Sequence, residues 1–267
     1  MGRALVLAHG LEGLGARSAA SLGASYFHGI APYLASKRLR VLTPRLHGIA
    51  PPHTRAAQLL EQIERWEERG EGERVSVIAH SQGGLDARWA ISRLGGDRLI
   101  ERLITLSAPH RGSALCGELA LPLLRSTPRV MQAAMESLCL PVEAAHFLSP
   151  AAMLQFNEEC VDSPGVTYFS LGGARPRYAE YWAPFMLLSP LLNRVDPGLN
   201  DGLVTTASAR WGEYLGTINF DHVDQLNFPL KLVHRAPMEP LWDYLVAVAA
   251  ADSCIPLPGC LALKQIM

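Results

Sequence analysis

The sequence has 267 residues, 49% of them hydrophobic and 18% charged, which is typical of a globular protein and long enough for one large α/β domain. The formal net charge is -1 without a Lys/Arg cluster, so nucleic acid is excluded as an expected partner. No apolar run approaches the roughly 18 residues of a membrane-spanning helix. An apolar run begins at Ala4 and leaves no room for a signal peptide. We therefore expect an intracellular protein, or a secreted or organellar one if the chain is trimmed.

Apolar runs alternate with segments of helical spacing over the first hundred residues. A wholly apolar run predicts a buried strand at residues 4–8, and further strands are predicted at residues 40–43 and 100–106 and from Val75. Helical spacing predicts helices at residues 26–36, 54–69 and 86–94. Strands that alternate with helices predict an α/β fold with a doubly wound, mostly parallel sheet. Active residues in such sheets lie at the carboxyl ends of the strands.

The segment RVSVIAHSQGGLDAR, residues 74–88, reads as a strand, a sharp turn and a helix. Its apex matches the nucleophile elbow G-x-S-x-G, with Ala79 in place of the first glycine. Such a turn strains the backbone of the serine, here Ser81, and projects its hydroxyl above the sheet. The alternative is a simple Ser-Gly turn that carries no chemistry.

The alternation stops over residues 113–165. Short helices are predicted at residues 119–124, 130–140 and 150–159, the last capped by Ser149. This helical insertion either packs on the sheet or forms a lid over an apolar groove, and the sequence leaves both open. A strand at 166–171, a Pro-rich connection at 174–200 and a closing helical region at 230–251 follow. We expect one domain, residues 1–267, with the insertion as its lid or cap.

A serine nucleophile needs a base to take its proton and an acid to orient that base. On this fold the chain order is serine, acid, histidine, which Ser81, Asp201 and His222 satisfy. Asp201 lies in an Asp-Gly turn and His222 in the loop DHVDQLN. The rival histidines are His80, His110 and His234, and the nearest rival acid is Asp196. Asp221 directly precedes His222 and should point away from it.

An oxyanion hole must also be in place to meet the charge that develops on the substrate carbonyl oxygen. The backbone N–H of Gln82, directly after the nucleophile, is one candidate donor. The second is expected from the loop after the first strand, where His9, Gly10 and Leu11 stand. Leu11 N–H is the candidate donor, and a simple glycine turn is the alternative.

Several segments together resemble a known family: LVLAHGLEG, SYFHGIAPYL, VIAHSQGGLDARWA, LSAPHRGS, LSPAAMLQFNEE and DGLVTTASARWGEYLGTINFDHVDQLN. They are similar to the bacterial family I triacylglycerol lipases of the Pseudomonas, Burkholderia and Proteus kind, and to the fungal mitochondrial-type lipases. The resemblance implies an α/β-hydrolase fold with a helical lid at 113–165. It also implies that Ser81 is the nucleophile, His222 the base and Asp201 the acid, with Leu11 and Gln82 as oxyanion donors.

The resemblance also raises the question of a metal. The bacterial lipases hold a structural Ca²⁺ with two aspartates near the catalytic histidine, and Asp224 matches one of them. The second has no clear counterpart, since Glu180 matches only loosely. We expect no cofactor to be required for the chemistry, with structural Ca²⁺ at Asp224 as an open alternative.

These observations predict a serine hydrolase of lipid esters, most simply acylglycerols, which it meets at a lipid–water interface. An esterase for short-chain, thioester or polyester substrates is the alternative within the same chemistry. A catalytically silent relative that serves as a binding module is the alternative outside it.

Overall fold

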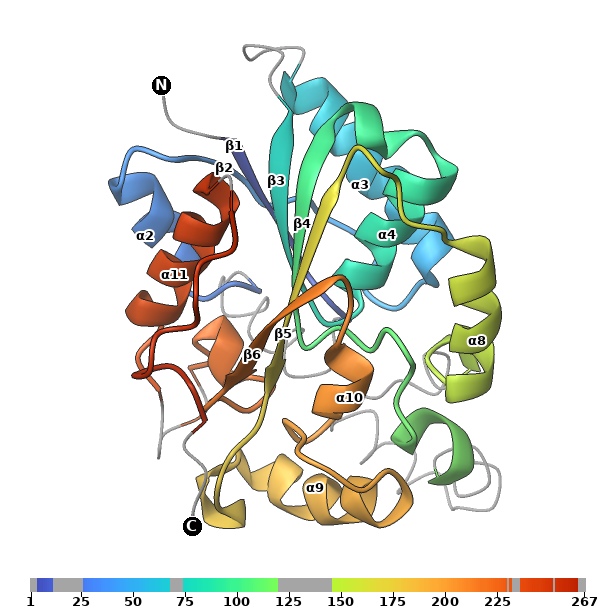
Figure 1. Cartoon of the computed structure of the whole chain (residues 1–267), viewed down its shortest axis with the longest axis vertical. Coiled ribbons are helices and arrows are strands. Elements are labelled where there is room, and N and C mark those ends of the chain that lie inside the picture. Colours follow the sequence, from blue (N-terminus) through green and yellow to red (C-terminus); the bar gives the residue numbers. More distant parts are fainter. Residues whose placement is uncertain are drawn as a thin grey trace.

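The computed structural model describes residues 4–11, 26–67, 74–119, 146–229, 231, 236–251 and 253–263. A six-stranded sheet with the order β2-β1-β3-β4-β5-β6 forms its centre, and all five neighbouring pairs are parallel (Figure 1). The strands are β1 (Ala4–Ala8), β2 (Arg40–Leu42), β3 (Val75–His80), β4 (Ile100–Leu106), β5 (Thr167–Gly173) and β6 (Glu213–Ile218). The predicted doubly wound parallel sheet is therefore confirmed.

Helices cover both faces of this sheet. The α-helices are α2 (Ile30–Ser36), α3 (Pro52–Glu67), α4 (Gly83–Arg93), α8 (Pro150–Glu159), α9 (Ala183–Val195), α10 (Thr206–Ala209) and α11 (Glu239–Ala250). The short single-turn segments are η1 (Gly96–Arg98), η2 (Leu115–Leu119), η3 (Tyr178–Glu180) and η4 (Asp224–Leu226). Figure 1 shows α2 and α11 on one side of the sheet and α3 and α4 on the other. Within the described residues, no helix is both long and apolar enough to traverse a bilayer.

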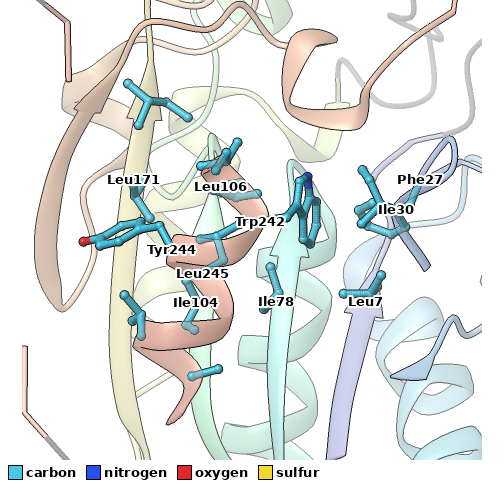
Figure 2. Packing of buried hydrophobic residues seen from close by; sticks show 14 of the residues in the cluster. Leu7, Phe27, Ile30, Ile78, Ile104, Leu106, Leu171, Trp242, Tyr244 and Leu245 are labelled. Carbon is cyan, nitrogen blue, oxygen red and sulfur yellow. The ribbon is translucent and has the colours of Figure 1, made fainter. Parts of the chain in front are cut away.

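Alternation along the strands explains why both faces bury apolar cores. In β1, Leu5 and Leu7 contribute to the core under α2 and α11, where Trp242 is fully buried (Figure 2). Val6 and its neighbours on the opposite face join the core under α3 and α4, which contains Leu59. Side chains alternate between the two faces with a period of two, so a strand that is buried on both sides must be apolar throughout. This explains the unbroken apolar run at residues 4–8.

A third apolar cluster lies around α8, α9 and the loops at the carboxyl ends of the strands. Met153, Phe185 and Leu192 are fully buried in it. The side chain of Leu11 packs against its edge. This cluster therefore places buried apolar side chains beside the loop that follows β1.

The Pro-rich segment 174–200 departs from the prediction of an irregular connection, because it contains the 13-residue helix α9. Pro184 stands in the first turn, where no helical N–H bond is lost, whereas Pro190 lies inside the helix. Phe185, Leu188 and Leu192 follow one another at helical spacing and are buried. Their burial offsets the hydrogen bond that the interior proline removes.

The rest of the insertion is only partly described. Helix α8 begins and ends where the sequence predicts, and the Ser149 hydroxyl caps it by accepting from Ala152 N–H at 3.2 Å. The predicted helix at 130–140 and all but the first residue of that at 119–124 lie outside the described residues. Whether residues 113–165 form a lid, and the division of the chain into one domain with an insertion, stay predictions.

Candidate active site

Ser81 stands at the tight bend between β3 and α4. Its φ of 55° lies in the left-handed region, which a residue with a side chain adopts only when its surroundings impose it. The N–H of Ser81 donates to the carbonyl oxygen of Leu106 at 2.9 Å, which ties the bend to β4. Strand, strained serine and helix follow in the order that the elbow pattern predicts.

The bend depends on close backbone approach, which glycines permit. A Cβ at Gly83 would overlap the carbonyl groups of Ala8 and His9, and a Cβ at Gly10 would lie 2.7 Å from the Cβ of Ser81. Side chains at these positions would force the helix and the β1 loop away from the elbow. The two glycines therefore bring the loop after β1 into contact with the serine.

His222 and Asp201 form a buried pair. The Nδ1 of His222 lies 2.7 Å from the Oδ2 of Asp201, and their side chains are 8% and 0% exposed. The other carboxylate oxygen of Asp201 accepts from the N–H groups of Leu203 and Val204, at 3.0 and 2.8 Å. Because these bonds come from fixed backbone donors, they hold the carboxylate oriented toward the imidazole. The rival acid Asp196 instead accepts from the Thr205 hydroxyl.

His80 links this pair to the elbow. Its ring centroid lies 4.4 Å from that of His222, and its Nε2 lies 3.1 Å from the carbonyl oxygen of His222. A carbonyl only accepts, so Nε2 carries the proton, and Nδ1 accepts from the hydroxyl of Tyr26 at 2.8 Å. Burial, followed by the neighbouring His222, holds the pKa of His80 well below 6.5. His80 is therefore a neutral structural contact that packs the histidine loop against the residue beside Ser81.

The structure thus places Ser81, Asp201 and His222 in loops at the carboxyl ends of the strands, but not all three are hydrogen-bonded to one another. Asp201 and His222 are hydrogen-bonded, whereas no hydrogen bond joins the hydroxyl of Ser81 to His222 within the described part of the chain. Catalytic hydrogen bonds of this kind are often long in ligand-free enzymes and shorten when substrate binds.

The loop after β1 is held by Arg55. Its Nη2 donates to the carbonyl oxygens of His9 at 2.5 Å and Gly10 at 3.0 Å, while its Nε donates to Asp86 at 2.7 Å. Both charged side chains are fully buried. In a trans peptide the C=O and N–H point in opposite directions, so fixing the Gly10 carbonyl also fixes the direction of the Leu11 N–H. Gln82, the other predicted donor, directly follows Ser81 at the start of α4.

Sequence reasoning did not identify Arg55, although a signal was present. Arg55, Leu59 and Ile63 follow one another at intervals of four in α3, and all three are fully buried. An arginine on the apolar stripe of an amphipathic helix must find buried acceptors. The spacing alone could have singled it out, but its acceptors come from another loop and another helix.

The remaining rival histidines have other surroundings. His110 is fully buried, where its Nε2 lies 3.1 Å from the Thr105 hydroxyl and its Nδ1 lies 3.4 Å from Arg88. It is therefore engaged within the fold and does not contact Asp201. His234 lies outside the described residues.

The surroundings of Asp224 test whether the residues present fit a calcium ion. Its Oδ2 already accepts from Arg175, from Lys231 and from the backbone N–H of Asp221, and its buried Oδ1 has no hydrogen-bond partner among the described residues. Calcium takes about six to eight oxygen ligands. No group of three or more His, Cys, Asp or Glu side chains within the described ranges could hold a metal. These residues do not fit Ca²⁺, and the mechanism below uses no metal. Whether the protein binds calcium stays a prediction.

Comparisons with known proteins agree with the expected family resemblance. A family model described as palmitoyl protein thioesterase matches residues 5–182. Triacylglycerol lipase 2 of Saccharomyces cerevisiae is 33% identical over 220 residues, which cover 78% of this chain and 64% of that relative. A triacylglycerol lipase of Vibrio cholerae is 26% identical over 270 residues, which cover 90% of this chain and 84% of the relative. The resemblance to bacterial and fungal lipases is thereby confirmed.

Solved structures support the fold. A metagenomic carboxyl esterase superposes with a TM-score of 0.73 at 24% identity, covering 92% of this chain and 75% of the other. The fold expected from the resemblance, an α/β-hydrolase, is thereby confirmed. The chain spans 64% of the length of the yeast relative, which is less than two thirds.

Proposed function

Because the chain belongs to the palmitoyl protein thioesterase family, we propose that it is a serine hydrolase of carboxylic esters, with Ser81 as nucleophile, His222 as base and Asp201 as acid. The observation that carries the proposal is the buried hydrogen bond of 2.7 Å between His222 and Asp201, beside a strained serine bend. The carboxylate fixes the proton of the imidazole on Nδ1, which leaves Nε2 free to accept a proton from the serine hydroxyl.

Acylation begins when the Oγ of Ser81 attacks the ester carbonyl carbon and its proton passes to Nε2 of His222. The carbonyl oxygen becomes an oxyanion, which accepts hydrogen bonds from the N–H groups of Leu11 and Gln82. When the intermediate collapses, the bond to the alcohol breaks and the imidazolium returns the proton to the leaving oxygen. The product of this half-reaction is an acyl ester of Ser81 and a free alcohol.

Deacylation repeats these steps with water. His222 takes a proton from a water molecule, the resulting hydroxide attacks the acyl carbon, and the proton returns to the Oγ of Ser81 as the carboxylic acid leaves. Asp201 stabilises the imidazolium in both halves and is not itself protonated. The chemistry of these residues needs no cofactor.

We propose lipid esters, most simply acylglycerols, as substrates. The name of the yeast relative supports this class, and the side chain of Leu11, beside the elbow, packs against an apolar cluster. The matched family description favours a second candidate, a thioester of a long acyl chain. Either substrate delivers the same acyl group to Ser81, and they differ only in the leaving group.

The direct test is Ser81→Ala measured with p-nitrophenyl esters and a fluorophosphonate probe. We expect kcat to fall about 10⁴-fold or more, because the nucleophile is removed, and the probe to label the wild type alone. Ser36→Ala is the matched control, because the Ser36 hydroxyl is exposed and donates only to the carbonyl of Tyr33. Unchanged hydrolysis in Ser81→Ala would contradict the proposal, and an unlabelled wild type would favour a silent binding module.

A second experiment separates the substrate classes. Rates are compared for acylglycerols of increasing chain length, with and without an emulsion surface, and for matched acyl thioesters. A rate that rises at the emulsion surface with long chains supports a lipase. Activity confined to short soluble esters, or a kcat/KM that is higher for thioesters, supports the alternatives.

A further inference from the structure

His222 is flanked by two buried aspartates that shape its loop. Asp221 accepts through Oδ1 from the N–H groups of Val223 and Asp224, at 3.1 and 2.9 Å, and so closes a turn over His222. Its Oδ2 accepts from the N–H of Trp182 at 2.7 Å. As the sequence predicts, the Asp221 carboxylate does not contact the imidazole. Both carboxylates of this turn are fully buried and need a positive charge nearby.

Two cationic side chains supply that charge. The Nζ of Lys231 lies 2.7 Å from Oδ2 of Asp221 and 2.7 Å from Oδ2 of Asp224. Arg175, which follows β5, lies 2.5 Å from the same oxygen of Asp224. The Lys231 side chain is 1% exposed, so its ammonium is a buried ion shared by two carboxylates. Two negative and two positive charges therefore balance within one cluster, which we name the four-charge cluster: Arg175, Asp221, Asp224 and Lys231.

Building on the proposed function, we propose that Lys231, with Arg175, takes the structural place of a divalent metal and positions His222 for catalysis without calcium. The ammonium of Lys231 contacts the carboxylates of Asp221 and Asp224 together, as a bound cation would. A side chain of the protein therefore closes the turn that carries His222. The backbone N–H of His222 donates to the carbonyl of Asp201 at 3.0 Å, so the same turn also fixes the histidine relative to its acid. Lys231 touches neither the imidazole nor the serine and is a positioning residue.

The first experiment uses the wild-type chain. Melting temperature and ester hydrolysis are measured after EDTA treatment and again with millimolar Ca²⁺. We expect neither to change, because the ammonium already neutralises the carboxylates that a metal would need. Loss of activity in EDTA, or a rise in melting temperature with Ca²⁺, would overturn the proposal.

The second experiment removes the ammonium while keeping the side-chain length, in Lys231→Met. The turn then has two close carboxylates and a single cation, so His222 loses its position. We expect kcat to fall on the order of 10²-fold with KM nearly unchanged, at a temperature where the variant is folded by circular dichroism. Wild-type kcat in the folded variant would overturn the positioning role.

Lys37→Met is the matched control, because Lys37 pairs with Asp243 at an exposed site and its loss should leave kcat unchanged. If Lys231→Met does not fold, the EDTA and Ca²⁺ measurements on the wild type can still overturn the proposal. Fluorophosphonate labelling distinguishes failure of the proposed function from failure of the positioning role of Lys231. A wild type that is neither labelled nor active would end the proposed function, while its melting response to Ca²⁺ would still test the four-charge cluster.

Discussion

The serine elbow and the histidine loop meet at one edge of the sheet but are held by different forces. The elbow is steric: its Ser81 has a strained backbone, and Gly83, two residues further on, permits close contact with the backbone of Ala8 and His9. The histidine loop is electrostatic: its position depends on Asp201 and on buried charges at Arg175 and Lys231, which are far apart in the sequence. A local motif therefore encodes one half of the candidate site, and long-range charge pairing encodes the other.

The largest expected effect on kcat comes from changing Asp201, the acid that bonds His222. Asp201→Asn keeps the shape but presents an amide to Nδ1, which favours the wrong imidazole tautomer. We expect kcat to fall about 10⁴-fold with little change in folding stability, measured by ester hydrolysis and denaturant unfolding. Asp196→Asn is the control, because Asp196 bonds Thr205 and not His222. Equal losses in both variants would contradict the assignment of the acid.

The next largest effect concerns Arg55 and Asp86, a buried charge pair beside the elbow. Arg55→Met leaves Asp86 as an uncompensated buried carboxylate, so we expect a loss of about 3 to 5 kcal/mol in the free energy of unfolding. In Arg55→Met we also expect a lower kcat, because the Gly10 carbonyl loses its donor. In the double variant Arg55→Met, Asp86→Leu, the free energy of unfolding should largely return, whereas kcat should be as low as in the single variant. Recovery of both quantities together would show that Arg55 serves stability alone.

A smaller effect tests the steric character of the elbow. In Gly10→Ala the new methyl group would meet the Cβ of Ser81 and the hydroxyl of Tyr26, each at 2.7 Å, and would push the Leu11 N–H out of place. Loss of one oxyanion donor predicts a fall in kcat of about 10²- to 10³-fold. Gly259→Ala is the matched control, because nothing lies within 4 Å of its added Cβ. A wild-type rate in Gly10→Ala would remove Leu11 from the proposed oxyanion hole.

The smallest effect concerns pH and the buried histidines. Burial, followed by the charges of Arg88 and Arg111, holds the pKa of His110 well below 6.5, and burial with Arg55 lowers that of His9 to about 4. At these two positions the unfolded chain binds more protons than the folded one below pH 6.5, so the stability that the neutral histidines contribute at pH 7.5 is lost as the pH falls. His110→Gln should reduce the loss between pH 7.5 and pH 5.5 by about 1 kcal/mol, measured by denaturant unfolding at both values.

Exposed His53 provides the comparison for this measurement. His53→Gln should leave the difference in stability between the two pH values as it is in the wild type. An identical response from the two variants would show that burial at residue 110 does not drive the acid sensitivity.

Strand positions and the elbow were predictable from the sequence because their signals are local. The apolar run at 4–8, the Gly-Gly pair that begins α4 and the Ser149 cap of α8 each depend on neighbouring residues. The helix at Ala183–Val195 was missed, because two prolines argued against it and only its burial in the third core stabilises it. Propensity is a weak guide wherever tertiary packing outweighs it.

Sequence patterns alone predicted the strands, the chain order of serine, acid and histidine, and the residues that we propose for the chemistry. The folded chain was needed to show that Asp201 bonds His222, that Arg55 holds the loop after β1, and that Lys231 lies between two aspartates. The physical reason is that buried charges require partners within about 4 Å, whatever their distance along the chain. The order of residues in the chain can suggest such a pair, but the fold brings the two side chains into contact.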